Sequence, residues 1–294
     1  MGVYVYLNGD FVPEEQAKIS VLDRGFLYGD GLFETMRAYS GHVFMLDDHL
    51  SRLYGSIDEL GIPLKKNKES MKTAIDRLME INHLFDAYIR VTVSRGKHSG
   101  ILTFNDDFNP TVVIMAKALS LYPLESYIEG VRVIVSEVRQ NSFSPLSVYK
   151  SLSYFNNILA KEEARTKGAF EAILLNSEGQ IAEGATSSVF IVKSKRIFTP
   201  PVTSHILPGI TRKTVLDMSA QLGCEIKEKG ITKETFFTSD EVFLTNSIME
   251  IVPVVSIDGH RVGDGTPGIQ YKRVIDQYRN LVSAHIEMSN PVQG

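Results

Sequence analysis

The 294-residue sequence is 43% apolar, enough to bury a substantial core in two domains or one large one. Lysine and arginine total 31 against 35 for aspartate and glutamate, so the formal net charge of -4 gives no reason to expect nucleic acid or an anionic membrane surface as a partner. The only cysteine, Cys224, excludes an intramolecular disulfide framework and a four-cysteine metal site.

The N-terminus lacks the basic, long-apolar and small-residue order of a secretory signal, and no apolar run approaches the roughly 20 residues that a membrane span needs. The seven histidines are scattered and show no metal-ligand spacing. We therefore expect a cytoplasmic protein without a metal ion. Its expected partners are small molecules or a second copy of itself, with no nucleic acid and no membrane.

The first 25 residues predict antiparallel β structure. Short strand patterns cover residues 3–9, 11–15 and 18–25. Asn8 and Gly9 are a hairpin signal between the first two of these strands.

Two amphipathic helices are expected next. Between Asp47 and Gly61 the apolar residues recur at helical spacing, with Asp47 as the N-cap and Gly61 as the C-terminal stop. A second helix is expected over residues 69–82. Residues 87–94 then alternate strictly, which predicts a strand with one core face and one polar face, and an apolar strand follows at 111–118.

A Pro-containing segment of mixed periodicity, residues 119–130, predicts a domain boundary. We expect an N-terminal domain at 1–119, a linker at 120–129 and a C-terminal domain at 130–294. The C-terminal part predicts a strand at 131–138, a helix at 154–168, strands at 170–176 and 187–193, a helix at 212–223, a strand at 241–246 and a terminal helix at 270–288 that packs on the second domain. Helices and strands mix without a regular βαβ rhythm, so the expected fold class is α+β rather than a doubly wound sheet.

Six sequence blocks carry a family resemblance. In chain order they are SVLDRGFLYGDGLFETMR, LDDHLSRL, KSLSYFNNILAKEEA, EAILLNSEGQIAEGATSSVFIV, ILPGITR and VFLTNSIMEIVPV. Together they resemble the fold-type IV pyridoxal-phosphate family of branched-chain aminotransferases, D-amino-acid aminotransferases and aminodeoxychorismate lyases. The resemblance covers nearly the whole chain. It implies a smaller N-terminal α/β sandwich, a larger C-terminal pseudo-barrel domain that binds pyridoxal 5'-phosphate, and a homodimer with active sites near its interface.

Lys150, at the start of the third block, is the candidate catalytic residue. A lysine amine forms an imine with an aldehyde cofactor and can then move a substrate proton as a general base, so the resemblance implies a Schiff base at Lys150. Taken alone, a lysine is usually a solvated surface residue. The resemblance also implies that Glu183 is the carboxylate that keeps the cofactor's ring nitrogen protonated. The alternative for Glu183 is a surface carboxylate beside a turn.

The block ILPGITR supplies a turn that leads into a helix whose first N–H groups are unpaired, a common setting for a phosphate. Thr211 fits as the N-cap of that helix, a role compatible with phosphate binding. The resemblance implies that the cofactor is also held by Ile210, Ser247, the phosphate residue Arg52, and Leu207 on one face of the ring. Otherwise Arg52 is a solvated charge on the polar side of a helix.

The resemblance implies substrate-binding roles for Tyr28, Phe33, Thr35, Tyr88, Arg90 and Ile248. Arg90 lies on the polar face of the strand at 87–94, as a carboxylate-binding residue should. Its alternative is an edge-strand arginine that faces water. Thr35 is typical of the lyases, whereas branched-chain enzymes often have glycine at this position. The lyases often add a second arginine further along, where this chain has Gly100, and Arg95 with His98 resembles inexactly the carboxylate trap of D-amino-acid enzymes.

These residues predict an aminotransferase that moves an amino group between an amino acid, with the branched-chain type favoured, and a 2-oxo acid such as 2-oxoglutarate. The alternatives are an aminodeoxychorismate lyase, a D-amino-acid aminotransferase and a non-catalytic protein that kept the fold and binds pyridoxal phosphate. Loss of Lys150, Glu183 or Arg52 would favour the last, and all three are present. Phe155 stands where branched-chain enzymes typically place a tyrosine that touches the cofactor's ring hydroxyl, so that contact is absent here or supplied differently.

Overall fold

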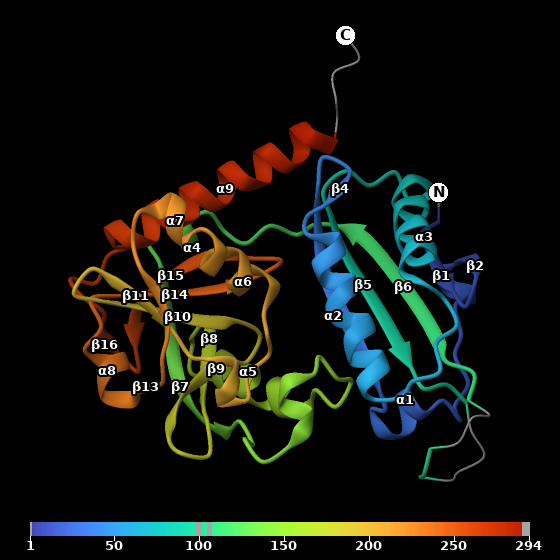
Figure 1. Cartoon of the computed structure of the whole chain (residues 1–294), viewed down its shortest axis with the longest axis horizontal. Helices are drawn as coiled ribbons and strands as arrows, with labels where there is room; N and C mark the ends of the chain where they lie inside the picture. The colour runs from blue at the N-terminus through green and yellow to red at the C-terminus, as the bar shows by residue number, and fades with distance from the viewer. Residues whose placement is uncertain (1, 98–101, 105–107, 290–294) are drawn as a thin grey trace. The chain divides into compact units, whose positions relative to one another are not determined.

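The computed structural model describes residues 2–97, 102–104 and 108–289. The chain divides into two compact units, which can be followed in Figure 1. Unit 1 comprises Met1–Ser120, Tyr149–Tyr154 and His285–Gly294, and unit 2 comprises Leu121–Val148 and Phe155–Ala284. Each unit combines a sheet with helices without a regular βαβ alternation, which confirms the expected α+β class. None of the helices within the described ranges is long and apolar enough to cross a membrane.

Unit 1 is built on a six-stranded antiparallel sheet with the strand order β2-β1-β6-β5-β3-β4. The strands are β1 (Tyr4–Leu7), β2 (Asp10–Pro13), β3 (Gly31–Tyr39), β4 (His42–Val43), β5 (Ala87–Ser94) and β6 (Thr111–Ala118). The expected hairpin joins β1 to β2, and Asn8 and Gly9 both adopt positive φ there, at 57° and 137°. Asparagine and glycine tolerate this conformation best, which explains why they occupy the turn. The predicted hairpin is confirmed.

Two helices, α2 (Leu46–Glu59) and α3 (Lys68–Ile81), pack on one face of this sheet. Their apolar stripes fill a core with the alternate residues of β3 and β5, so both expected helices are confirmed. The expected N-cap is wrong. The cap residue of α2 is Met45, and Asp47 lies in the first turn, where a carboxylate still favours the positive end of the helix dipole.

The strand expected at residues 18–25 is wrong. After the short 3-10 helix η1 (Glu14–Gln16) the chain forms no strand as far as Asp23, which caps the helix α1 (Arg24–Tyr28) by accepting a hydrogen bond from the Gly25 N–H at 2.8 Å. The alternating apolar residues of this segment are exposed. Because no described strand pairs with them, the alternation does not produce a sheet face.

The two faces of β5 differ as its alternation predicts. Ala87, Ile89, Val91 and Val93 are fully buried toward the helices, while the residues between them are partly exposed. Arg90 lies on this second face. Since β5 lies between β6 and β3, Arg90 is not an edge-strand residue, and that alternative is excluded.

Unit 2 is built on a ten-stranded mixed sheet that curls into a half barrel, with the order β12-β11-β10-β14-β15-β7-β8-β9-β13 and β16 paired to β15. The strands are β7 (Val131–Arg139), β8 (Glu171–Leu175), β9 (Gln180–Gly184), β10 (Ser188–Lys193), β11 (Arg196–Thr199), β12 (Ile226–Glu228), β13 (Ile231–Thr232), β14 (Glu241–Asn246), β15 (Glu250–Ile257) and β16 (His260–Arg261). The pairs β11–β12, β15–β7 and β7–β8 are parallel, and the others are antiparallel.

The helical segments of unit 2 surround this sheet. They are α4 (Glu125–Ile128), η2 (Pro145–Val148), α5 (Phe155–Thr166), η3 (Val202–Ser204), α6 (Ile210–Asp217), α7 (Ser219–Leu222), α8 (Lys233–Phe237) and most of α9 (Ile269–Ser289). The single helix expected at 212–223 is in fact two, because α6 ends at its C-cap Met218. The terminal helix is confirmed on unit 2, where the Tyr271 hydroxyl donates to the Tyr127 carbonyl at 3.3 Å.

Candidate active site

Lys150 lies in the short unit 1 segment Tyr149–Tyr154, which runs along β3. The Phe33 N–H donates to the Lys150 carbonyl at 2.9 Å, and the Leu152 N–H donates to the Gly31 carbonyl at the same distance. Both bonds join backbone to backbone, so β3 sets the position of Lys150 without using its side chain. The backbone of this segment is therefore anchored to β3 on both sides of Lys150.

The buried ring of Phe33 contacts two cations. The Arg90 Cζ is 3.8 Å from the ring centroid, and the Lys150 Nζ is 4.4 Å from it. Thr35 is the cross-strand partner of Arg90 and lies on the same sheet face as Phe33. The structure thus brings together four predicted residues: a lysine, an aromatic ring, a threonine and an arginine.

A tyrosine lies near the lysine, although Phe155 replaces the tyrosine of the branched-chain enzymes. Tyr154 makes an edge contact with Phe33 at 5.2 Å between centroids, and its ring centroid is 5.9 Å from the Lys150 Nζ. Phe155 begins α5 and is 68% exposed. The aromatic environment of the lysine therefore comes from Phe33 and Tyr154.

The other two substrate residues predicted in unit 1, Tyr28 and Tyr88, fall in different places. Tyr88 shares the partly exposed face of β5 with Arg90, and the Lys117 Nζ is 5.1 Å from its ring centroid. Tyr28 ends α1, where the Arg24 Cζ is 5.4 Å from its ring centroid. The structure therefore groups Tyr88 with Arg90, and Tyr28 with the arginine network described next.

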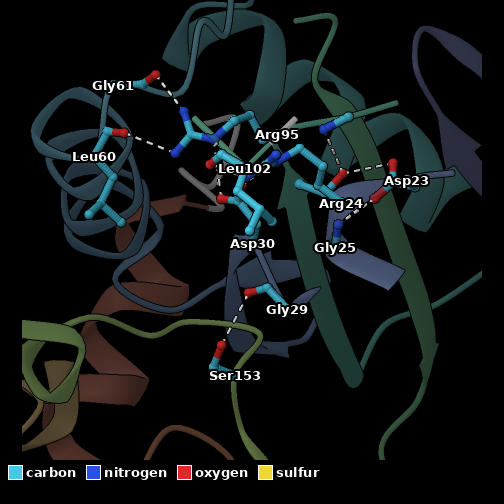
Figure 2. A network of polar contacts seen from close by, with 12 residues as sticks. Asp23, Arg24, Gly25, Gly29, Asp30, Leu60, Gly61, Arg95, Leu102 and Ser153 are labelled. Atoms are coloured by element: carbon cyan, nitrogen blue, oxygen red, sulfur yellow. Dashed lines mark hydrogen bonds and ion pairs between the residues drawn. The ribbon is translucent and has the colours of Figure 1, made fainter. Parts of the chain in front are cut away.

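Two buried arginines share one carboxylate beside α1. The Arg24 Nε donates to Asp30 at 2.6 Å, and the Arg95 Nε donates to the same carboxylate at 3.0 Å. Figure 2 shows both arginines beside Asp30. The other two nitrogens of Arg95 donate to the carbonyls of Gly61 at 2.7 Å and Leu60 at 3.0 Å. Arg95 thus satisfies the C-terminal carbonyls just beyond α2 and ties them to the chain that enters β3.

This network corrects the interpretation of Arg95 as half of a substrate carboxylate trap. The side chain is 2% exposed and all three of its nitrogens are used within the fold, so it is not available to a substrate. His98, the other half of that interpretation, lies outside the described residues. So does Gly100, the position of the second lyase arginine.

Arg52 is also held by a carboxylate. Its Nε and Nη2 donate to the two oxygens of Glu34, each at 2.7 Å, and the His49 Nδ1 lies 2.7 Å from Glu34 Oε2. Burial by itself raises the pKa of Glu34, but the Arg52 charge and the hydrogen bonds from His49 and Arg52 outweigh it and lower the pKa to about 2. Arg52 is therefore not the solvated surface charge of the alternative interpretation.

Glu183 is buried in β9 of unit 2, which excludes the surface-carboxylate alternative. The Gln140 side-chain amide donates to one of its oxygens at 3.1 Å, and the Leu207 N–H donates to the other at 3.2 Å. The predicted residues Glu183 and Leu207 are thus brought together, and each carboxylate oxygen has a protein donor.

The start of α6 holds two further predicted residues, Ile210 and Thr211, both buried. The prediction that Thr211 is the N-cap is wrong. Gly209 is the N-cap, and the helix begins at Ile210. Gly209 has no side chain that could accept from the N–H groups of this first turn. A Cβ at Gly209 would lie 2.7 Å from the Ser188 hydroxyl, so the glycine allows the start of the helix to lie close to Ser188.

Ser247 and Ile248 lie in the turn between β14 and β15. The Asn246 carboxamide organises this turn, because its oxygen accepts from the N–H groups of Ile248 at 2.9 Å and Met249 at 2.8 Å. Ser247 therefore lies between Asn246 and the two residues whose N–H groups bond to the Asn246 side chain.

Residues 31–257 match the family described as amino-transferase class IV. The chain belongs to the class IV aminotransferase family. A protein of Methanocaldococcus jannaschii, whose name as a branched-chain-amino-acid aminotransferase is provisional, is 40% identical over 94% of this chain and 96% of its own length. A D-alanine aminotransferase of Bacillus licheniformis is 34% identical over 95% of this chain and 96% of its own length. An aminodeoxychorismate lyase of Bacillus subtilis is 34% identical over 92% of this chain and 94% of its own length.

Solved structures agree with this assignment. The branched-chain aminotransferase of Thermoproteus uzoniensis with norvaline matches at a TM-score of 0.90 and 34% identity, over 99% of this chain and 98% of that chain. The branched-chain amino acid aminotransferase of Thermobaculum terrenum in its PLP-form matches at a TM-score of 0.84 and 29% identity, over 96% of this chain and 94% of that chain. The fold-type IV architecture is thereby confirmed, and the chain is an aminotransferase of a family that uses pyridoxal phosphate.

The residues of this aminotransferase fit that cofactor. An aldehyde needs an amine, a ring nitrogen needs a carboxylate and a phosphate needs N–H donors, and the chain offers Lys150, the buried Glu183 and the uncapped first turn of α6. Within residues 2–97, 102–104 and 108–289, no group of three or more His, Cys, Asp or Glu side chains is arranged to hold a metal ion.

Sequence reasoning misses three residues of this aminotransferase: Glu34, His49 and Gln140. The spacing of three between His49 and Arg52 is a usable signal, because such residues share a helix face. Glu34 and Gln140 give no comparable signal. Their partners lie 18 and 43 positions away and meet them only through tertiary packing.

Proposed function

We propose that this aminotransferase works in the cytoplasm and moves an amino group between an amino acid, with branched-chain side chains favoured, and a 2-oxo acid such as 2-oxoglutarate. The observation that carries the proposal is that Arg90 and Lys150 approach the same ring, that of Phe33, at 3.8 and 4.4 Å. Amino acids and 2-oxo acids share a carboxylate next to the reacting carbon, so one arginine near the lysine suits both. The single Cys224 suits a reducing compartment.

The proposed cofactor residues come from the family resemblance: Arg52, Lys150, Glu183, Leu207, Ile210, Thr211 and Ser247. When bound, pyridoxal phosphate supplies the aldehyde that takes up the amino group and the ring that accepts the electrons of the substrate's α-C–H bond. Glu183 would hold the proton on the ring nitrogen. The N–H groups that begin α6 and the charge of Arg52 would bind the phosphate.

Lys150 has two tasks in this proposal. Its Nζ would be the covalent attachment point of the cofactor, and as a free amine it would take up the substrate's α-proton as a general base. Arg90 binds the substrate carboxylate and so fixes which C–H bond faces the amine. Phe33, Thr35, Tyr28, Tyr88 and Ile248 are proposed to shape the space for the side chain.

Thr35 favours a second candidate, an aminodeoxychorismate lyase. Its position directly opposite Arg90 places a hydroxyl beside the proposed carboxylate-binding residue, where branched-chain enzymes often have glycine. A D-amino-acid aminotransferase is the other alternative. A D-alanine aminotransferase and an aminodeoxychorismate lyase are each 34% identical to this chain, so identity does not separate the two alternatives. We rank transamination first because Arg90 stacks on Phe33 at the ring that Lys150 also contacts.

One experiment tests these choices. The holoenzyme is incubated with single L- or D-amino acids and 2-oxoglutarate, and the 2-oxo acids formed are measured, with pyruvate release from aminodeoxychorismate measured alongside. We expect branched-chain L-amino acids to be converted fastest. Rapid pyruvate release without conversion of any amino acid would contradict the aminotransferase proposal and support the lyase. Borohydride reduction followed by peptide mapping should find the cofactor on Lys150, and an adduct on Lys161 or Lys167 would contradict the assignment.

We also propose a homodimer. A run of large apolar side chains in the segment before and within α1 is 43 to 72% exposed: Ile19, Val21, Leu22, Phe26, Leu27 and Tyr28. Such a contiguous apolar surface favours a protein partner, and the family resemblance names a second copy. Sedimentation at micromolar concentration should show a dimer, and Val21→Glu should weaken it. A catalytically competent monomer would refute this part.

A further inference from the structure

One charged side chain is buried on the helix-facing side of β3. Glu34 is 1% exposed and shares that side with Leu32 and Met36, which belong to the apolar core. Burying a carboxylate costs free energy unless it is paired and fully hydrogen-bonded. An apolar residue at this core position would avoid that cost, which suggests that Glu34 has a role other than stabilising the core.

The partners of Glu34 both come from one face of α2. Arg52 donates to it through two parallel hydrogen bonds, each at 2.7 Å, and His49 donates from Nδ1 at 2.7 Å. His49 and Arg52 are three positions apart, so the helix presents both to one carboxylate. We call Glu34, His49 and Arg52 the Glu34 triad. A bidentate fork fixes the guanidinium plane as well as its position.

The charges of the Glu34 triad balance. The pKa of Glu34 is lowered to about 2, so the carboxylate is ionised throughout the working range. Burial lowers the pKa of His49, so the imidazole is neutral near pH 7 and serves as a donor without adding a second positive charge. One carboxylate therefore offsets one guanidinium. Glu34 partly neutralises the positive charge of Arg52 and at the same time fixes the orientation of its guanidinium group.

We infer that Glu34 and His49 are positioning residues that fix the orientation in which Arg52 presents its other donors to the cofactor phosphate. This rests on the proposed function, in which Arg52 binds that phosphate. The orientation role and a purely electrostatic role predict opposite signs. If charge alone mattered, removing the Glu34 carboxylate would leave Arg52 more positive and tighten phosphate binding.

The test compares pyridoxal 5'-phosphate with pyridoxal, which lacks the phosphate. Equilibrium dialysis of the protein against each compound gives two dissociation constants for the wild type, Glu34→Gln, Arg52→Ala and the double variant. We expect Glu34→Gln to weaken binding of pyridoxal phosphate about tenfold or more, the scale of a lost charge-assisted bond, and to leave pyridoxal within about twofold. In the Arg52→Ala background the same change should have no further effect.

His49 gives a second route that retains the carboxylate. His49→Leu should weaken pyridoxal phosphate selectively, and His49→Asn, which keeps an N–H donor near the Nδ1 position, should restore most of the affinity. Asp58→Asn, an exposed carboxylate on α2, is the matched control and should change neither constant. If Glu34→Gln does not fold, the Leu and Asn variants of His49 decide the question.

Three results would overturn the inference: unchanged or tighter binding of pyridoxal phosphate in Glu34→Gln, equal weakening of both compounds, or an undiminished effect in the Arg52→Ala background. The last two would mark a general structural role. Failure of the proposed function looks different. In that case Arg52→Ala alone would leave the ratio of the two constants unchanged, which would remove Arg52 from the phosphate site and the inference with it.

Discussion

The guanidinium carbon of Arg90 lies 3.8 Å from the ring centroid of Phe33, on the face of the unit 1 sheet that its helices leave uncovered. A planar guanidinium stacks on a ring and still presents its donors at the edge, whereas an ammonium cannot do both. In the proposed function, the stack would hold Arg90 in place for a planar carboxylate before a substrate arrives. Preorganisation of this kind lowers the entropic cost of binding.

Replacing Arg90 tests this relationship. We expect Arg90→Ala to raise KM for the amino acid and for 2-oxoglutarate about 10- to 100-fold, the scale of a lost charge-assisted pair, and to leave cofactor binding nearly unchanged. Arg90→Lys should recover little, because lysine loses both the stack and the bidentate edge. Steady-state kinetics with both substrates measure the change. Arg77→Ala, an exposed arginine paired with Glu80, is the control, and equal effects of the two variants would contradict the role.

Arg90 and Glu34, which lie on opposite faces of the unit 1 sheet, differ in how far the sequence predicts their positions. The alternation of β5 predicts which face carries Arg90, because a strand has a period of two and its apolar residues must face a core. The same rule says nothing of Glu34. Its position on the apolar side of β3 makes sense only once α2 places His49 and Arg52 against it, and helix-to-sheet packing has no local signature. The missed cap of α6 has a similar origin, since the space around Gly209 is set by Ser188, 21 positions earlier.

The pH dependence of stability should reveal Glu34. Its pKa is lowered from 4.5 to about 2, so the carboxylate contributes stability of about 3 kcal/mol that is present above pH 4.5 and lost as the pH falls toward 2. His49, whose pKa is lowered from 6.5 chiefly by burial, acts in the same direction, and its contribution begins to fall as the pH drops below 6.5. Urea unfolding of wild type and Glu34→Gln at about pH 7, 5 and 3 measures this. We expect the difference between them to shrink at the lowest pH, and a difference that grows on acidification would be inconsistent with it.

Gln140 should matter through Glu183. Its amide donates to one Glu183 oxygen at 3.1 Å, so Gln140→Leu leaves that oxygen with one donor fewer and lets the carboxylate rotate. We expect kcat to fall by about 3- to 10-fold with KM for the amino acid unchanged, because the proposed contact of Glu183 is with the cofactor and not with the substrate. Gln180→Leu removes an amide from the same strand as Glu183 and serves as the control. A change confined to KM would rule out the proposed route.

The last prediction concerns the carboxylate that Arg24 and Arg95 share. Asp30 accepts from both side chains, which are 5% and 2% exposed, so Asp30→Asn would remove the negative charge that these two buried guanidinium groups share. Losing one partner of a buried ion pair costs about 3–5 kcal/mol, and here two cations lose it together. We expect Tm to fall by roughly 10 °C in calorimetry. Because the same network holds α1, the exposed apolar segment should also lose its fixed shape and the proposed dimer should weaken in sedimentation.

Arg24→Met added to Asp30→Asn should regain part of the stability, since only one buried cation then remains. Glu80→Gln, which removes one exposed carboxylate of an i,i+3 pair, should shift Tm by less than about 1 °C. Equal Tm values for Asp30→Asn and Glu80→Gln would show that the shared carboxylate contributes no more than a surface charge.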